Sequence, residues 1–152
     1  MTTHSHFSVQ PLAGAVGAVL NGLDLRAPLS ADLIAEIRAT WLTHGVIFFR
    51  DQPLLEAGFQ AFAERFGQVV EYPFVKGIEG FPLIIPVLKL PHERNNFGGI
   101  WHTDTAYLET PPMATMLIAR EVPPFGGDTL FASGYAAFEG LSPAMQDRKS
   151  VV

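Results

Sequence analysis

Apolar residues recur at intervals of three and four positions in two stretches of the chain, the spacing that puts side chains on one face of a helix. The two stretches contain Leu33, Ile34, Ile37 and Trp41, and then Leu55, Phe59, Phe62 and Phe66. Ser30 is placed to cap the first helix, which we expect to end near residues 44–45. Gly67 should stop the second helix, and residues 135–141 predict a third, shorter one.

Short runs of β-branched and aromatic residues, bounded by glycine, proline or charged residues, predict strands. These runs are residues 7–12, 15–20, 46–49, 82–88, 114–119 and 129–132. Gly14 and Gly17 lie where the first two strands would turn into each other. Residues 91–99 are polar and end in glycine, as a loop over a binding site would. Together with the helices, these strands predict a mixed α+β fold.

The composition predicts a folded, soluble protein. The 152 residues are 48% hydrophobic and 16% charged, which is enough apolar material for a sizeable core. The net charge is -5 and no basic cluster could neutralise a row of phosphates, so we expect no nucleic-acid partner. No apolar segment reaches the roughly 20 residues that a membrane helix needs, so we expect no membrane partner and a cytoplasmic location.

Cysteine is absent, which excludes disulfides, thiol nucleophiles and thiolate metal ligands and leaves nitrogen and oxygen to hold any metal. His102 and Asp104 offer both atoms, in the run Trp101-His102-Thr103-Asp104. Side chains two positions apart on an extended segment point the same way, with backbones roughly 6 to 7 Å apart, so both can reach one ion. They would be two members of the 2-His-1-carboxylate triad that binds Fe(II). For this tripeptide alone, the alternative is a surface histidine beside a turn-forming aspartate.

A second motif, Gly126-Gly127-Asp128-Thr129, follows further along the chain. The glycine pair would let the backbone approach a ligand closely, and the hydroxyl of Thr129 could donate a hydrogen bond to an anion. The alternative is an ordinary hairpin turn, for which Gly-Gly-Asp is equally suited.

The order and spacing of these motifs resemble the first iron-binding block of the taurine dioxygenase family. The matching strings in that block are residues 101–104, 109–112, 121–123 and 126–130. Upstream, the family's landmarks are matched by residues 22–25, 28–30, 46–52 and 64–67. The similarity therefore runs from about residue 7 to residue 146. Several landmarks at consistent spacing are more specific than any one motif.

The resemblance implies a truncated double-stranded β-helix (a jelly roll of the clavaminate synthase type), with N-terminal strands and two flanking helices. It also implies Fe(II), with 2-oxoglutarate as cosubstrate and dioxygen as oxidant. His102 and Asp104 match the first two iron ligands, and Thr129 matches the hydroxyl that contacts the distal carboxylate of 2-oxoglutarate. In family chemistry 2-oxoglutarate is converted to succinate and carbon dioxide while a C–H bond of a small molecule is hydroxylated.

The sequence departs from the taurine-using members at the substrate. Where those members carry a histidine and a tyrosine, this chain has Tyr72 and Val75, and Gly98 stands in place of an asparagine. We therefore expect another small organic substrate, which could be a sulfonate, a sulfate ester or a carboxylate. Tyr72 is the candidate substrate contact, and its alternative is an aromatic residue of the core or rim.

Residues 1–146 are expected to form the N-terminal part of a single domain of this family. Family members are longer, and their second half brings a third ligand histidine and an arginine that pairs with the cosubstrate carboxylate. After Thr129 this chain has no histidine and a single arginine, Arg148, so we expect the fragment alone to be inactive. Residues 147–152 match the translation of a common sequencing adapter, and our hypothesis is that they are a non-native tail. Homo-oligomerisation of the full-length parent stays open.

Two other functions compete with this hypothesis. The first is a non-catalytic jelly-roll module with a binding or structural role, which metal-dependent succinate formation would exclude. The second is a cupin-like hydrolase or isomerase that uses another metal and no cosubstrate. Turnover of 2-oxoglutarate, or the charge-transfer band of an anaerobic Fe(II) complex, would exclude that second alternative.

Overall fold

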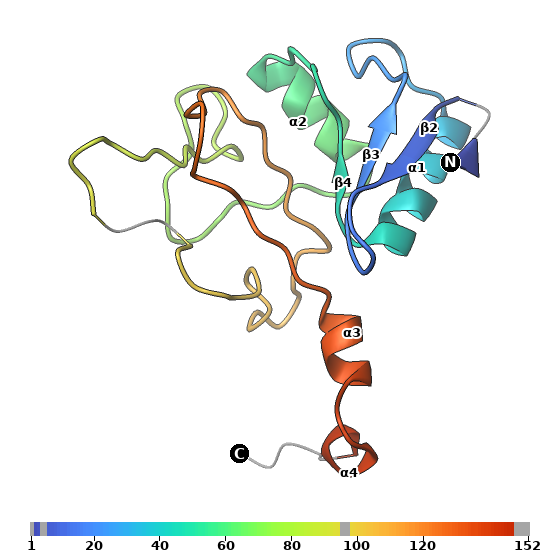
Figure 1. The fold of residues 1–152 in the computed structure, drawn as a ribbon. Helices are drawn as coiled ribbons and strands as arrows, with labels where there is room; N and C mark the ends of the chain where they lie inside the picture. Colours follow the sequence, from blue (N-terminus) through green and yellow to red (C-terminus); the bar gives the residue numbers. More distant parts are fainter. Residues whose placement is uncertain (1, 4–5, 95–97, 148–152) are drawn as a thin grey trace. The chain divides into compact units, whose positions relative to one another are not determined.

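The computed structural model describes residues 2–3, 6–94 and 98–147 of the chain. The backbone divides into two compact units, of which the first is Met1–Pro53 with Pro123–Val152 and the second is Leu54–Val122. The first unit contains the sheet and its covering helix (Figure 1). Within the described ranges, no helix has the length and apolar character needed to cross a membrane.

A four-stranded sheet forms the centre of the first unit, in the order β1-β2-β3-β4. The strands are β1 (Thr2–Thr3), β2 (Ser8–Pro11), β3 (Ala18–Asn21) and β4 (Ile47–Phe48). β2 and β3 are antiparallel, with Val9 opposite Leu20, whereas β3 and β4 are parallel, with Ala18 opposite Ile47. The predicted strands at residues 7–12, 15–20 and 46–49 are confirmed in shortened form, and β1 is an addition to them.

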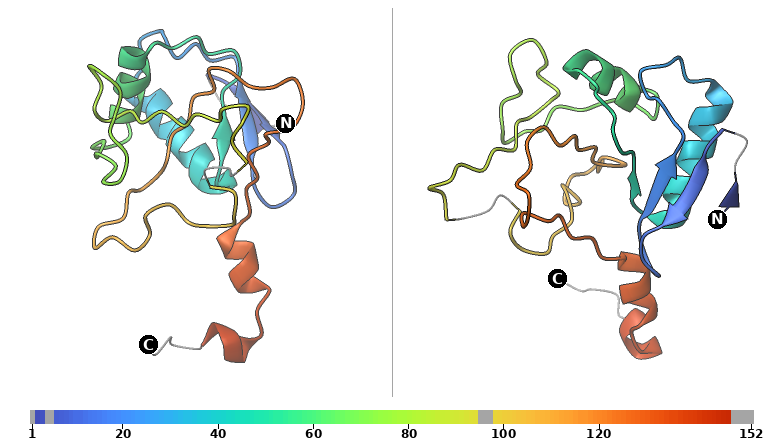
Figure 2. Two further views of the ribbon diagram at one scale, coloured as in Figure 1. Left: turned by 90° about the vertical axis from the view of Figure 1, so that its left-hand side faces the viewer. Right: turned by 45° about the horizontal axis from the view of Figure 1, so that its top comes forward.

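Helix α1 (Ala31–His44) makes the crossover that two parallel neighbouring strands require, and Figure 2 shows it lying along one face of the sheet. Ser30 caps the helix as predicted, since its hydroxyl accepts a hydrogen bond from the Leu33 N–H at 3.1 Å. Gly45 ends the helix with a φ of 71°. The buried side chains are Leu33, Ile34, Ile37 and Thr40. Trp41, on the same predicted face, is half-buried, and its indole N–H donates to the Gly45 carbonyl at 3.0 Å.

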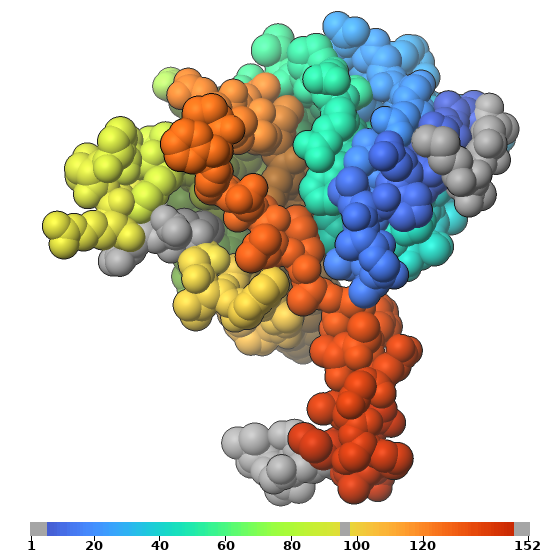
Figure 3. Space-filling model, viewed as in Figure 1, coloured from blue at the N-terminus to red at the C-terminus, as the bar shows by residue number. Residues whose placement is uncertain are grey.

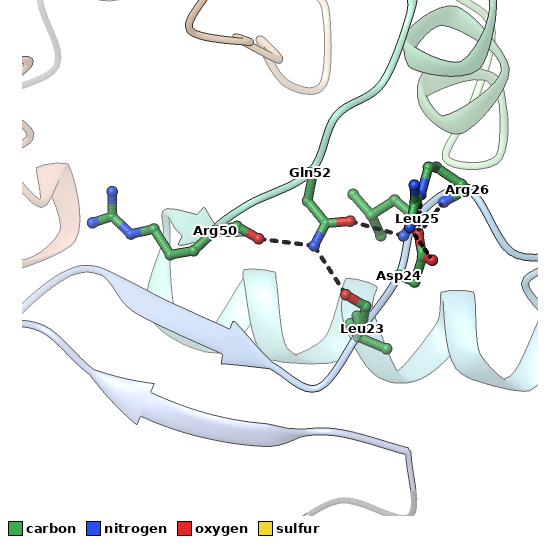
Figure 4. A network of polar contacts seen from close by, with 6 residues as sticks. All are labelled: Leu23, Asp24, Leu25, Arg26, Arg50 and Gln52. Carbon is green, nitrogen blue, oxygen red and sulfur yellow. Dashed lines mark hydrogen bonds and ion pairs between the residues drawn. The ribbon is translucent and has the colours of Figure 1, made fainter.

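The Gln52 side chain ties the segment after β4 to the loop after β3 (Figure 4). Its amide oxygen accepts from the Leu25 N–H at 2.9 Å, and its amide nitrogen donates to the carbonyls of Leu23 at 2.9 Å and Arg50 at 2.8 Å. A single side chain therefore satisfies three backbone groups that no strand pairs.

The second unit begins with helix α2 (Glu56–Glu64), which confirms the predicted second helix but stops short of the end of its apolar stripe. Phe62 is its buried residue, with its ring edge-on to that of Phe66 at 5.2 Å between centroids. Arg120 holds the amino end of the helix, because its guanidinium donates to the Leu54 carbonyl and pairs with Glu56 at 3.1 Å.

Three predicted strands are wrong for the described residues, namely 82–88, 114–119 and 129–132, which belong to no strand. A strand exists through hydrogen bonds to a neighbour, and these segments have none in the four-stranded sheet. Their apolar side chains are accordingly open to solvent, as with Val87, Leu117 and Leu130, which are 59%, 65% and 70% exposed. The described residues thus have the expected mixed α+β class with fewer strands than expected.

Two short helices close the described chain. α3 (Gly134–Glu139) is the predicted third helix with slightly shifted bounds, and α4 (Pro143–Gln146) follows it. Neither helix has a buried residue, and Figure 3 shows their side chains open to solvent on the face in view. Tyr135 is 84% exposed and Phe138 is 54% exposed.

Candidate metal centre

The segment that carries the candidate ligands belongs to no helix or strand, and it bends at Ile100 and again at Asp104. The Ile100 carbonyl lies 2.7 Å from Nδ1 of His102 and therefore accepts a hydrogen bond from that nitrogen. This bond fixes the imidazole with its Nε2 edge turned away from the backbone. A metal-binding histidine is commonly oriented in this way, through a hydrogen bond from its other ring nitrogen.

Asp104 faces the Nε2 edge of His102. Its Oδ1 lies 3.2 Å from that nitrogen, so the convergence of the two side chains expected from their spacing occurs in the structure. Two atoms bound at right angles to one divalent ion, each at about 2.1 Å, lie about 3.0 Å apart. The separation of Nε2 and Oδ1 fits this arrangement, and both side chains are about half exposed, so an ion can reach them.

Thr115 is a further member of the cluster that sequence reasoning missed. Its hydroxyl donates a hydrogen bond to Oδ2 of Asp104 at 2.7 Å. The residue lies in a segment predicted as a strand, and nothing in the local pattern pointed to a partner 11 positions upstream. The two oxygens of the Asp104 carboxylate consequently have different neighbours, a hydroxyl on one side and an imidazole on the other.

The surroundings of His102 favour its protonated form. The hydrogen bond to the Ile100 carbonyl raises the pKa of His102, loss of solvent contact opposes the increase, and the Asp104 carboxylate adds to it. A divalent ion bound between Nε2 and Oδ1 would compete with a proton for the same nitrogen.

Backbone strain follows directly after Asp104. Thr105 is buried and has a φ of 45°, a left-handed conformation that is unusual for a β-branched residue. The turn that it begins is closed by a hydrogen bond from the Leu108 N–H to the Thr105 carbonyl at 3.1 Å. Strain of this kind gathers at functional sites, where the surrounding structure maintains it.

Gly98 approaches the imidazole from the other direction. A Cβ atom at this position would lie 3.2 Å from Cε1 of His102 and 3.8 Å from its Nε2, and the φ of 69° also disfavours a side chain. This glycine therefore leaves the Nε2 edge uncrowded.

A third metal ligand is not found beside this pair. Across the described residues no group of three or more His, Cys, Asp and Glu side chains could hold a metal ion. The described chain thus offers one imidazole nitrogen and one carboxylate oxygen, a donor set that suits Fe(II) but does not complete its coordination.

Thr129, the candidate cosubstrate residue, belongs to the other compact unit of the chain. It is exposed in the irregular segment before α3, and the two glycines of its motif, Gly126 and Gly127, have φ values of 76° and 70°. The motif therefore has the left-handed backbone expected of a glycine turn. The assignment of Thr129 to 2-oxoglutarate stays a prediction.

Tyr72, the candidate substrate contact, lies in the same unit as His102 and Asp104. It is half-buried, and its ring is edge-on to that of Phe74 at 5.6 Å between centroids. Phe74 in turn lies 6.4 Å from the ring of Tyr107, three positions after Asp104. Tyr72 is thus part of an aromatic row on this unit, and its contact with substrate stays a prediction.

Comparison with known proteins agrees with the motif pattern. The alpha-ketoglutarate-dependent sulfate ester dioxygenase of Pseudomonas putida is 34% identical, over 91% of this chain and 46% of its own length. An alkylsulfatase of Acinetobacter baylyi is 31% identical, over 88% of this chain and 41% of its own. The chain therefore spans about half the length of the curated relatives it matches.

A solved structure has a similar backbone. It belongs to a Burkholderia xenovorans protein named as an alpha-ketoglutarate-dependent taurine dioxygenase, with a TM-score of 0.79 and 35% identity. The match covers 92% of this chain and 50% of that one. The model of the family described as taurine catabolism dioxygenase TauD, TfdA family matches residues 8–150. The chain therefore belongs to the TauD/TfdA family of dioxygenases, which is a family of enzymes.

Proposed function

We propose that the protein of which this chain is part is an Fe(II)- and 2-oxoglutarate-dependent dioxygenase that hydroxylates a small organic molecule. The observation that carries the proposal is the 3.2 Å approach of His102 Nε2 to Asp104 Oδ1, within a family of such enzymes. His102 and Asp104 would hold the iron, and Thr129 would donate its hydroxyl to the cosubstrate. When bound, the iron and 2-oxoglutarate supply the activation of dioxygen.

The roles of the chain's own residues follow from their contacts. The Ile100 carbonyl keeps the His102 ring turned so that Nε2 would be available to the metal. Asp104 supplies a negative charge through Oδ1, which lowers the net charge of the site toward neutrality. Gly98 keeps side-chain atoms away from the same edge of the imidazole.

For the substrate we propose a sulfonate, a sulfate ester or a carboxylate with an apolar part. Its support is that relatives are named for sulfate esters and for phenoxypropionate, compounds that join an anionic group to carbon chains or rings. The aromatic row of Tyr72, Phe74 and Tyr107 offers apolar surface of matching chemistry in the unit of the candidate ligands.

The complete domain is proposed to be a jelly roll in which this chain is the N-terminal part. A third ligand histidine and a cosubstrate-binding arginine are required from the other part, since the described residues offer two metal ligands. Because the described residues lack a third metal ligand, this chain on its own also fits a second function, that of a non-catalytic binding or structural module. Succinate release from 2-oxoglutarate by the complete protein separates the two functions.

Metal binding to the chain itself provides the direct test. We expect Mn(II), an air-stable substitute for Fe(II), to broaden the ring signals of His102 in NMR spectra before those of His44 and His92. Asp104→Asn should weaken this binding at least tenfold, because it removes one of two ligands. In His102→Ala, which has no His102 ring signals, the broadening of the backbone amide signals of Thr103 and Asp104 should weaken as much. His92→Ala is the matched control and should leave the binding unchanged. Uniform broadening of all histidines, or unchanged binding in both ligand variants, contradicts the proposal.

A further inference from the structure

The two carboxylate oxygens of Asp104 are not equivalent. Oδ2 accepts the hydroxyl hydrogen of Thr115 at 2.7 Å, while Oδ1 lies 3.2 Å from Nε2 of His102. A half-exposed aspartate is otherwise free to rotate about its Cα–Cβ bond, which changes the direction of the carboxylate. The Thr115 hydroxyl gives one of these rotamers a hydrogen-bonding partner that the others lack.

We propose that Thr115 is a positioning residue for the metal ligand Asp104. The inference rests on the proposed function. It names a residue that sets the direction of the Asp104 carboxylate and, through it, the affinity of the site for metal. With Oδ2 engaged by a hydroxyl, the carboxylate presents one oxygen to the metal, which leaves more coordination positions for other ligands than a carboxylate bound through both oxygens. A hydrogen bond to a charged carboxylate is strong enough to enforce this choice.

The contact joins two segments that no strand pairing holds together. Thr115 and Asp104 are 11 residues apart, and both lie outside the strands of the structure. Neither residue is buried, so the bond adds no packing to a core. Its principal effect is therefore on the direction of the Asp104 side chain.

Three variants of the 152-residue chain test this role. Thr115→Val keeps the shape of the side chain but removes the hydroxyl, and Thr115→Ser keeps the hydroxyl. Thr43→Val is the matched control, because it removes a hydroxyl hydrogen bond of 2.9 Å, to the Ala39 carbonyl, far along the sequence from the candidate ligands. Far-ultraviolet circular dichroism should show the same helix content in all three.

The first measurement needs no metal. The Hα–Hβ couplings of Asp104 should indicate a single rotamer in the wild-type chain, in Thr115→Ser and in Thr43→Val, and averaged rotamers in Thr115→Val. Couplings that are the same in Thr115→Val and wild type overturn the inference, whatever the chain does with metal. The proposed function is not tested by this measurement, so the two can fail separately.

The second measurement is the Mn(II) concentration that half-broadens the His102 ring signals. It should rise about tenfold in Thr115→Val, the usual effect of removing a group that orients a ligand, and return to within about twofold in Thr115→Ser. Equal values in wild type and Thr115→Val overturn the inference. If wild type shows no broadening at His102, the proposed function fails and the inference, which rests on it, fails as well.

Discussion

Individual side chains fix local geometry on both units of the chain by satisfying backbone or carboxylate groups. Gln52 bonds three backbone groups that no strand pairs, and Arg26 surrounds the Asp24 carboxylate with its guanidinium and its backbone N–H. Thr115 donates its hydroxyl to one oxygen of the Asp104 carboxylate. At this scale, side-chain hydrogen bonds satisfy polar groups that strand pairing satisfies within a sheet.

The Asp24–Arg26 contact predicts a pH dependence. The hydrogen bonds from the Arg26 side chain, and then from its backbone N–H, lower the pKa of Asp24 from the usual 3.8 to about 2. Because the folded value is the lower one, the ionised carboxylate stabilises the fold above pH 3.8, and this contribution is lost as the pH falls toward about 2. We expect Arg26→Gln to return the NMR titration midpoint of Asp24 toward 3.8.

High salt should reduce the same shift in the wild-type chain, because the pair is exposed and screened. Arg38→Gln, at a half-buried arginine of the same unit, is the control and should leave the Asp24 midpoint in place. A midpoint near 3.8 in the wild-type chain would contradict the role of Arg26.

At the scale of elements, the helices could be predicted and half of the strands could not. The bounds of α1 follow from Ser30, from Gly45 and from the apolar spacing within the 14 residues of the helix. A strand, in contrast, depends on a partner that the local sequence does not name, which is why residues 82–88, 114–119 and 129–132 were misassigned.

The residues of the candidate site also differ in whether the local sequence reveals them. His102 and Asp104 are near neighbours and were found, whereas Thr115 was missed because its contact is not local.

The cap of α1 carries a measurable part of the stability. Ser30→Ala removes the acceptor of the Leu33 N–H at 3.1 Å, and we expect the free energy of unfolding to fall by about 1 kcal/mol. Ser142→Ala is the matched control, because Ser142 precedes α4 but its side chain makes no capping hydrogen bond. Urea unfolding followed at 222 nm checks both variants. An equal loss in the two would show that the capping bond is not the cause.

For the whole molecule, the distribution of apolar side chains is the dominant feature. The core of the first unit includes Val9, Leu20 and Ile37, all at most 8% exposed, whereas the segments predicted as further strands expose Val87, Leu117 and Leu130. Soluble proteins seldom leave so much apolar surface uncovered unless another surface packs on it. In the proposed jelly roll, that surface would be the other part of the domain.

This distribution predicts opposite effects of similar substitutions. Changing Val87, Leu117 and Leu130 together to Ser should reduce binding of a hydrophobic dye and self-association in sedimentation, because each side chain is more than half exposed. The unfolding free energy should change by less than about 1 kcal/mol, as is usual for surface positions. Leu20→Ser, at a position 3% exposed in the central strand β3, is the control. It should lower the unfolding free energy several times more than the triple variant does. If the triple variant unfolds instead, these segments are packed in solution, and the chain has a larger core than its sheet and helices account for.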